Sequence, residues 1–70
     1  MLIFGIVGEL VEEFTDDTEI RSELYNETDG CRSVIRMMDV EFDEVIQIKR
    51  FPSQGMAAAE FAEIKRYAAM

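Results

Sequence analysis

The chain's only proline, Pro52, divides a long stretch with strand-like alternation from a shorter stretch with helical spacing. Directly before it, in Val45–Phe51, the apolar Ile46 and Ile48 alternate with polar residues, which is the period-two pattern of a half-buried strand. Proline cannot donate a hydrogen bond to a strand ladder, so we expect this strand to end at Phe51. The pattern therefore predicts a sheet first and a helix after it.

Three more segments before Pro52 are typical of strands, namely Met1–Gly8, Glu19–Thr28 and Arg32–Val40. The dipeptide Asp29-Gly30 between the last two is a strong signal for a tight hairpin turn. Turns are also expected at the two remaining connections, Thr15–Thr18 and Glu41–Glu44. Alternation predicts that the inward-facing side chains of the second and third segments are those of Ile20, Ser22, Leu24, Ser33, Ile35 and Met37.

The segment Glu9–Phe14 fits two structures, because its apolar residues have helical spacing but could also lie on a strand that continues the first one. We favour the strand. The alternative is a helix within residues 9–27, which would give the order β-α-β-β-α. Two glycines precede this segment, and within a strand they indicate a bulge or a close approach of another backbone; they are Gly5 and Gly8.

The segment Gln54–Met70 is predicted to be a helix, with Ser53 as its N-cap. Helical spacing gives it an apolar stripe made of Ala57, Phe61, Ile64 and Ala68, and a water-facing side with Glu60, Glu63, Lys65 and Arg66. The predicted fold is therefore α+β: an antiparallel β-meander of three to four strands, with the C-terminal helix packed on one face. Residues 1–70 form a single small domain.

Composition removes most catalytic and metal chemistry. The chain has no histidine and one cysteine, Cys31, so it has neither an internal disulfide nor an ordinary zinc site, and Cys31 has no imidazole to activate it. The acidic segments also fail the EF-hand pattern for calcium. We expect no enzyme activity, no cofactor and no metal. A lone cysteine and the absence of a signal peptide or membrane span favour a cytoplasmic protein.

The net charge of −8 is concentrated in the first thirty residues, which hold nine carboxylates and one base, Arg21. Such a surface repels nucleic acid and attracts the basic grooves that normally hold it. The nine acidic residues are predicted to bind a partner; they are Glu9, Glu12, Glu13, Asp16, Asp17, Glu19, Glu23, Glu27 and Asp29. A second acidic patch is expected to join them, made of Asp39, Glu41, Asp43 and Glu44.

Two aromatic residues, Tyr25 and Phe42, lie among these acids. Core packing is favoured for each of them, and the alternative is an anchor at a binding surface. Met37 and Met38 are adjacent, so on a strand they face opposite ways, and one of them lies outside the main core unless that sheet face is covered. The basic residues of the second half could cluster on adjacent strands, where we expect them to pair with acids across the sheet; they are Arg32, Arg36, Lys49 and Arg50.

In size, acidity and lack of catalytic residues, the chain resembles the small phage-encoded inhibitors of the anti-CRISPR type, some of which mimic DNA. The resemblance covers the overall character of the chain and no motif. It implies a protein that binds an RNA-guided complex or nuclease in a bacterial host and blocks contact with target DNA. The function expected first is therefore a non-enzymatic inhibitor that binds a basic nucleic-acid-binding groove, with neither nucleic acid nor membrane bound directly.

Two other functions are compatible with the same sequence. One is a small homodimeric structural or adaptor module, which would pair through an uncovered sheet face and leave the acids merely solvated. The other is an acidic antitoxin that neutralises a basic toxin.

Overall fold

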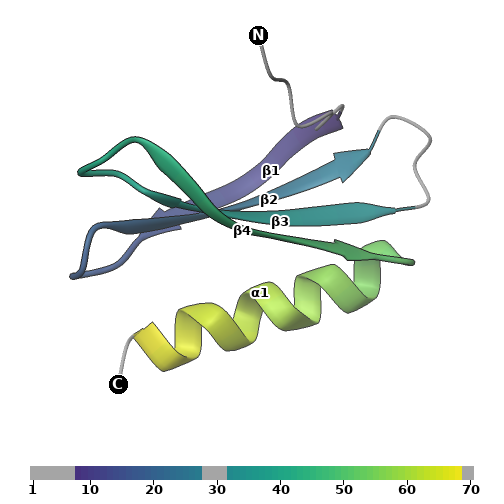
Figure 1. The fold of residues 1–70 in the computed structure, drawn as a ribbon. Helices are drawn as coiled ribbons and strands as arrows, with labels where there is room; N and C mark the ends of the chain where they lie inside the picture. The colour runs from purple at the N-terminus through teal and green to yellow at the C-terminus, as the bar shows by residue number, and fades with distance from the viewer. Residues whose placement is uncertain (1–7, 28–31, 69–70) are drawn as a thin grey trace, which may run out of the picture.

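Four antiparallel strands followed by one helix make up the fold in the computed structural model, which describes residues 8–27 and 32–68. The sheet order is β1-β2-β3-β4, so each strand pairs with its neighbour in sequence (Figure 1). This confirms the predicted meander with a C-terminal helix, and the alternative helix within residues 9–27 is wrong. The elements are β1 (Gly8–Thr15), β2 (Ile20–Glu27), β3 (Ser33–Asp39), β4 (Glu44–Phe51) and α1 (Gln54–Ala68).

The apolar residues of Glu9–Phe14, which have helical spacing in the sequence, lie on a strand, β1, that contains a bulge. The β1–β2 register shifts between Leu10 and Glu12, so one extra residue, Val11, enters the strand there. As a result Leu10 lies opposite Tyr25, while Phe14 lies opposite Ser22 on the face that carries the helix. Apolar residues four apart thus belong to opposite faces of one strand.

The main hydrophobic cluster lies between the sheet and α1, while Val34 and Met38 are buried on the other face of the sheet. Leu24 and Ile35 are paired on the two central strands, and they pack against Ala57 and Phe61 of the helix. Phe61 is 1% exposed, and its ring meets that of Phe14 edge to face, with 6.3 Å between ring centroids. Burying a phenylalanine side chain stabilises a fold by about 1.5–3 kcal/mol, so this residue is a large part of a small core.

The start of α1 follows the sequence prediction, because the Ser53 hydroxyl accepts a hydrogen bond from the Met56 backbone N–H at 3.2 Å. The predicted apolar stripe is confirmed for Ala57 and Phe61, which are buried, and for Ile64, which packs on the core. It is wrong for Ala68, which is exposed because the helix ends there.

Two of the helix residues predicted to face water instead lie at the rim of the contact with the sheet. Lys65 pairs with Glu12 of β1, and Glu60 pairs with Lys49 of β4 at 3.2 Å. Each of these ion pairs therefore ties α1 to one edge strand of the sheet.

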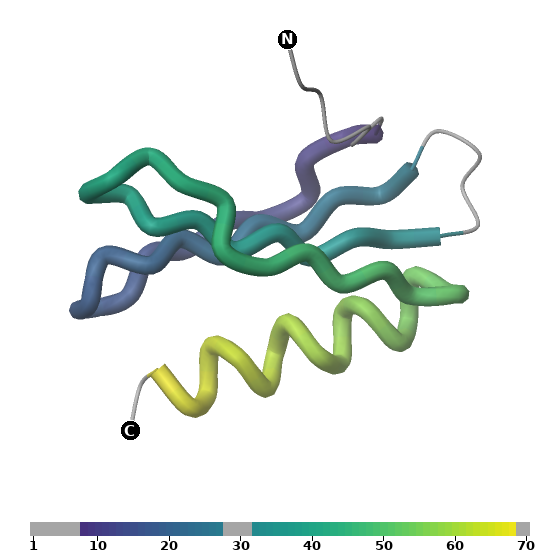
Figure 2. Tube along the Cα trace, in the orientation of Figure 1, coloured from purple at the N-terminus to yellow at the C-terminus, as the bar shows by residue number. Residues whose placement is uncertain are grey.

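Both edge strands of the sheet are bulged. Besides the bulge in β1, the β3–β4 register shifts between Met37 and Met38, which adds Ile46 to β4. Bulges bend an edge and discourage pairing with another chain. The turn that joins β1 to β2 and the turn that joins β3 to β4 lie at the same end of the sheet (Figure 2).

At the other end, Gly8 allows β1 to approach β2 closely. A Cβ atom at this position would lie 2.1 Å from the Asn26 carbonyl oxygen, which confirms the expected close approach. The predictions for the rest of Met1–Gly8 with Gly5, for the Asp29-Gly30 turn and for Cys31 lie outside the described residues. The described helix is neither long nor apolar enough to cross a membrane.

Candidate functional site

Two carboxylate-rich turns lie side by side at one end of the sheet. Ile20 and Asp39 are paired at the ends of β2 and β3, and just beyond them the Val40 backbone N–H donates a hydrogen bond to the Glu19 carbonyl oxygen at 2.9 Å. The fold thus joins the second predicted acidic patch to part of the first. We call this set of seven residues the acidic end: Asp16, Asp17, Glu19, Asp39, Glu41, Asp43 and Glu44.

The first turn is organised by Asp16. Its Oδ1 accepts hydrogen bonds from the Thr18 backbone N–H at 2.8 Å, the Thr18 hydroxyl at 2.6 Å and the Ile20 backbone N–H at 3.1 Å. The hydrogen bond from the Thr18 hydroxyl, followed by that from the Ile20 N–H, holds the pKa of Asp16 below its usual value of 3.8. Asp16 is therefore a structural residue of the turn, and Asp17 and Glu19 are the exposed carboxylates there.

The second turn is also fixed by its own acids. The Asp39 Oδ1 accepts a hydrogen bond from the Phe42 backbone N–H at 3.3 Å. Asp43 has a φ of 53°, and Glu19 in the first turn has a φ of 60°. Both lie in the left-handed region that favours glycine, so each turn holds an acidic residue in a costly backbone conformation.

None of the seven carboxylates of the acidic end forms an ion pair within the described residues. Residues 15–20 and 39–44 contain no lysine or arginine. The last turn of α1 lies beneath the same end of the sheet (Figure 1), but its bases pair elsewhere, Lys65 with Glu12 and Arg66 with Glu63. Five of the seven acidic residues are exposed, while Asp16 and Asp39 are half-buried.

The other acids of the first patch are dispersed. Glu12 is paired with Lys65, and Glu9 and Glu27 lie at the opposite end of the sheet from the turns. Glu13 is exposed on β1, directly opposite Glu23. Asp29 lies outside the described residues.

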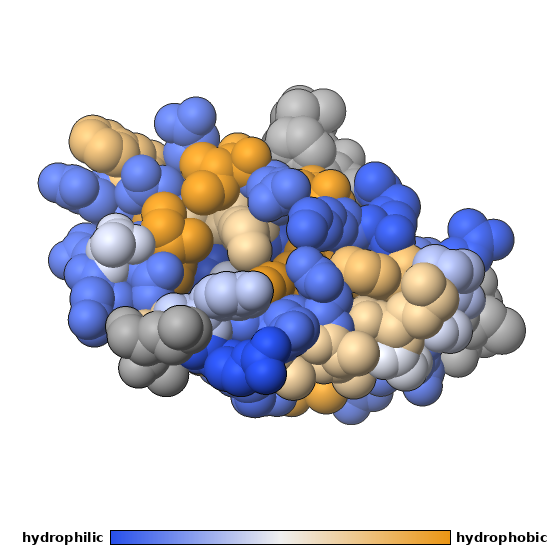
Figure 3. Space-filling model, turned by 90° about the horizontal axis from the view of Figure 1, so that it is seen from below, coloured by the Kyte–Doolittle hydropathy of each residue, from blue (hydrophilic) through white to orange (hydrophobic). Residues whose placement is uncertain are grey.

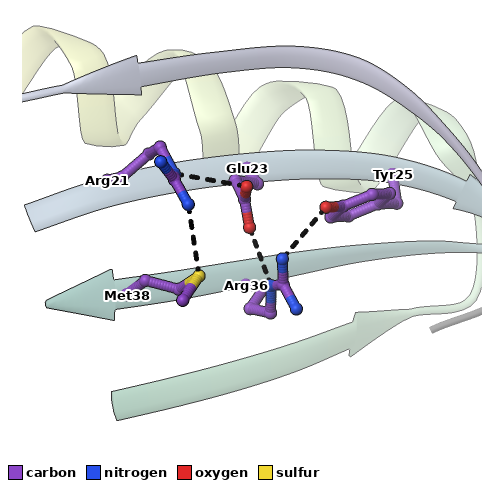
Figure 4. A network of polar contacts seen from close by, with 5 residues as sticks. All are labelled: Arg21, Glu23, Tyr25, Arg36 and Met38. Carbon is purple, nitrogen blue, oxygen red and sulfur yellow. Dashed lines mark hydrogen bonds and ion pairs between the residues drawn. The ribbon is translucent and has the colours of Figure 1, made fainter. Parts of the chain in front are cut away.

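Glu23 is buried, with 4% of its surface exposed, on the sheet face opposite α1 (Figure 4). Its Oε1 accepts a hydrogen bond from the Arg36 Nε at 2.7 Å across the sheet, and its Oε2 lies 3.3 Å from the Arg21 Nε. That second contact is an ion pair alone, because the Arg21 Nε has no hydrogen-bond partner in residues 8–27 and 32–68. Glu23 is thus neutralised by arginines and is separate from the exposed acidic surface.

Arg36 links this network to Tyr25. Its Nη2 donates to the Tyr25 hydroxyl at 3.1 Å, and its guanidinium carbon lies 5.5 Å from the Tyr25 ring centroid. The hydrogen bond to Glu23 raises the pKa of Arg36 above its usual value. The expected cross-strand pairing is confirmed for Arg36, whereas Lys49 pairs with the helix instead, and no ion pair of Arg32 or Arg50 is seen in the described parts of the chain.

The two candidate anchors therefore differ. Tyr25 is half-buried and held by Arg36, whereas Phe42 is 70% exposed in the β3–β4 turn, so the favoured prediction of core packing is wrong for Phe42. Of the paired methionines, Met38 lies on the face opposite the helix, where its sulfur accepts from the Arg21 Nη2 at 3.5 Å, as the alternation predicts (Figure 4).

The exposure of two other apolar residues of the β3–β4 hairpin was not predicted, Val40 at 41% and Ile46 at 51%. The alternation of apolar and polar residues predicts a half-buried position for Ile46. The β-bulge that adds Ile46 to β4 changes this position, and nothing in the sequence indicates that bulge. Seen from the helix side, apolar side chains lie among hydrophilic ones at the left end, where the turns are (Figure 3).

The described part of the chain encloses no pocket, and no three of its aspartate and glutamate side chains are placed to hold a metal ion. No protein-family model matches the chain, and neither a curated protein nor a solved structure matches it.

Proposed function

We propose that this protein is a non-enzymatic inhibitor whose acidic end binds a basic, nucleic-acid-binding groove of a target protein. The observation that carries the proposal is the joining of two carboxylate-rich turns, without any basic residue, at one end of the sheet. Like charges held together cost stability, and a domain of this size has little stability to spare. Binding to a basic partner would replace this repulsion between carboxylates with attraction between opposite charges.

The spacing of the charges suits a groove that holds a phosphate backbone. Neighbouring strands of a sheet lie about 4.8 Å apart. Phosphates along one strand of B-DNA follow at about 3.4 Å of axis. Asp39 and Glu44 are paired at the ends of β3 and β4, so their backbone positions are separated on the same scale as neighbouring phosphates. Such a surface would release counterions from the arginines and lysines of its partner.

The resemblance to anti-CRISPR inhibitors makes purified, guide-loaded RNA-guided nuclease complexes the first targets to test. The chain would be immobilised, and binding of each complex would be measured at low and high salt, with and without target DNA. We expect binding to at least one complex, weakened by salt and displaced by DNA. Absence of binding to every complex, or binding that DNA leaves unchanged, would overturn the proposal.

A matched pair of variants tests the position of the charge. Asp17→Lys with Glu41→Lys reverses one carboxylate in each turn, and Glu9→Lys with Glu27→Lys makes the same change in net charge at the opposite end of the sheet. The turn variant should bind at least about tenfold more weakly than the control variant, because only its charges face the groove. Equal loss in both would mean that net charge alone governs binding.

A further inference from the structure

The β3–β4 turn combines the acidic end with an apolar tip. Val40, Phe42 and Ile46 come from one hairpin, and they are three of the seven large apolar side chains exposed in the described residues. Glu41, Asp43 and Glu44 stand between them in the sequence. Single exposed apolar residues are normal on a protein surface, but three on one hairpin, one of them a largely exposed aromatic ring, need an explanation.

The tip is held in place before any partner arrives. The Asp39 carboxylate accepts a hydrogen bond from the Phe42 backbone N–H, and the Val40 backbone N–H is bonded to Glu19 of the neighbouring turn. A preorganised turn presents its side chain at a low entropic cost on binding. An aromatic side chain surrounded by polar groups is also the usual composition of a binding hot spot.

We infer that Phe42 is an anchor that inserts into an apolar socket rimmed by arginine or lysine side chains on the target protein. This inference rests on the proposed function and specifies the partner: a basic protein surface with a cavity the size of a benzyl group. The carboxylates on either side of Phe42 select the cationic rim, and the ring fills the socket. A phosphate backbone fits neither requirement, because Glu41 and Asp43 would repel it.

The carboxylates and the Phe42 ring should contribute differently to binding as the salt concentration rises. Attraction between exposed charges is screened as the Debye length falls from about 10 Å at 0.1 M salt to about 3 Å at 1 M. Burial of an aromatic ring is not weakened in this way. An anchored complex should therefore keep part of its affinity at high salt, whereas binding by charge alone should be lost.

The test uses a nuclease complex that binds the wild-type chain and compares Phe42→Ser with Met56→Ser. The control residue, Met56, is a large apolar side chain that is 55% exposed, against 70% for Phe42, and it lies near the start of α1, at the opposite end of the sheet from the two turns (Figure 1). Phe42→Ser should weaken binding at least about tenfold at both low and high salt, while Met56→Ser leaves it unchanged. Both side chains are largely exposed, so both variants should fold, which far-UV circular dichroism verifies.

A second pair of variants, Ile46→Ser and Val11→Ser, tests another apolar residue of the β3–β4 hairpin. Val11 is the matched control, because Ile46 and Val11 are 51% and 52% exposed and lie on the two opposite edge strands. Only the change at Ile46 should weaken binding. If wild-type and Phe42→Ser bind equally, the anchor is wrong while the charge-based function stands. If no complex binds the wild-type chain, both fail, and binding of the chain to single-stranded DNA or RNA alone would likewise contradict them.

Discussion

The Val40 backbone N–H donates a hydrogen bond to the Glu19 carbonyl oxygen at 2.9 Å, and this bond joins the two acidic turns. It continues the β2–β3 pairing one step beyond Ile20 and Asp39. Backbone pairing in the middle of the sheet thus brings together seven carboxylates that repel one another. The position of the charge follows from sheet topology, since consecutive hairpins place alternate turns at the same end.

Repulsion within the acidic end predicts that salt stabilises this protein. Raising sodium chloride from about 0.1 M to 1 M shortens the Debye length from about 10 Å to 3 Å, so the free energy of unfolding should rise by about 0.5 kcal/mol or more. Urea unfolding followed by circular dichroism measures it. The variant Glu41→Gln with Asp43→Asn should show a smaller rise, and an equal rise would place the repulsion elsewhere.

Asp16 should confer pH-dependent stability on the first turn. Its pKa is lowered by hydrogen bonds in the folded state, so its contribution is present above the unfolded-state pKa, near 3.8, and is lost as pH falls through the folded-state pKa. At about pH 7, Asp16→Ala should lower the free energy of unfolding by about 1–2 kcal/mol, because three donors lose their acceptor.

The pH dependence separates this effect from general acid unfolding. The difference in free energy of unfolding between the wild type and Asp16→Ala should be constant above about pH 5 and shrink below about pH 4. The matched change at the exposed neighbour, Asp17→Ala, should show neither the loss nor this dependence. A difference that stays constant down to about pH 2 would mean that the carboxylate acts only through its volume.

The sheet and the helix could be predicted from the sequence because their signals are local. Alternation around Ile35 and Ile48, the proline at position 52 and the cap at Ser53 each depend on near neighbours in the chain. The bulges could not be predicted, since a single extra residue changes the register without changing composition. The bulges nevertheless determine which apolar residues are exposed, because Val11 and Ile46 are the extra residues at the two bulges and both are exposed.

The candidate site was predicted only in part, for a related reason. Asp17 and Glu41 are far apart in sequence, and their placement at one end depends on the whole meander. Glu23 looked like its acidic neighbours, but its register position opposite Arg36 buries it in an ion pair. Counting charges along the chain cannot separate these two cases, because pairing across the sheet determines which carboxylates are neutralised.

Replacing Glu19 by glycine should give a more stable protein than replacing it by alanine. Both changes remove the carboxylate, but only glycine adopts a φ of 60° without a steric cost. Glu19→Gly should therefore have a free energy of unfolding about 1 kcal/mol higher than Glu19→Ala. Urea unfolding of the two variants measures the difference. At Thr18, in the same turn and without a positive φ, glycine should instead be no better than alanine.

The pairing of Glu23 with Arg36 predicts strong energetic coupling between the two positions. Glu23→Leu removes the carboxylate that accepts the hydrogen bond from Arg36 and forms the ion pair with Arg21, so it should lower the free energy of unfolding by about 2 kcal/mol or more. This is below the loss for a fully buried pair, because the Arg36 side chain remains 24% exposed.

Arg36→Leu should also destabilise the fold, because it leaves a buried carboxylate with only the weaker contact to Arg21. The double variant removes both charges from the same face and fills the space with apolar groups, so its loss should be at least about 1 kcal/mol smaller than the sum of the single losses. The control cycle, Lys49→Leu with Glu60→Leu, breaks a more exposed pair and should show coupling of only about 0.5 kcal/mol. Additive losses at Glu23 and Arg36 would show that burial of the carboxylate depends on the neighbouring strands and not on this ion pair.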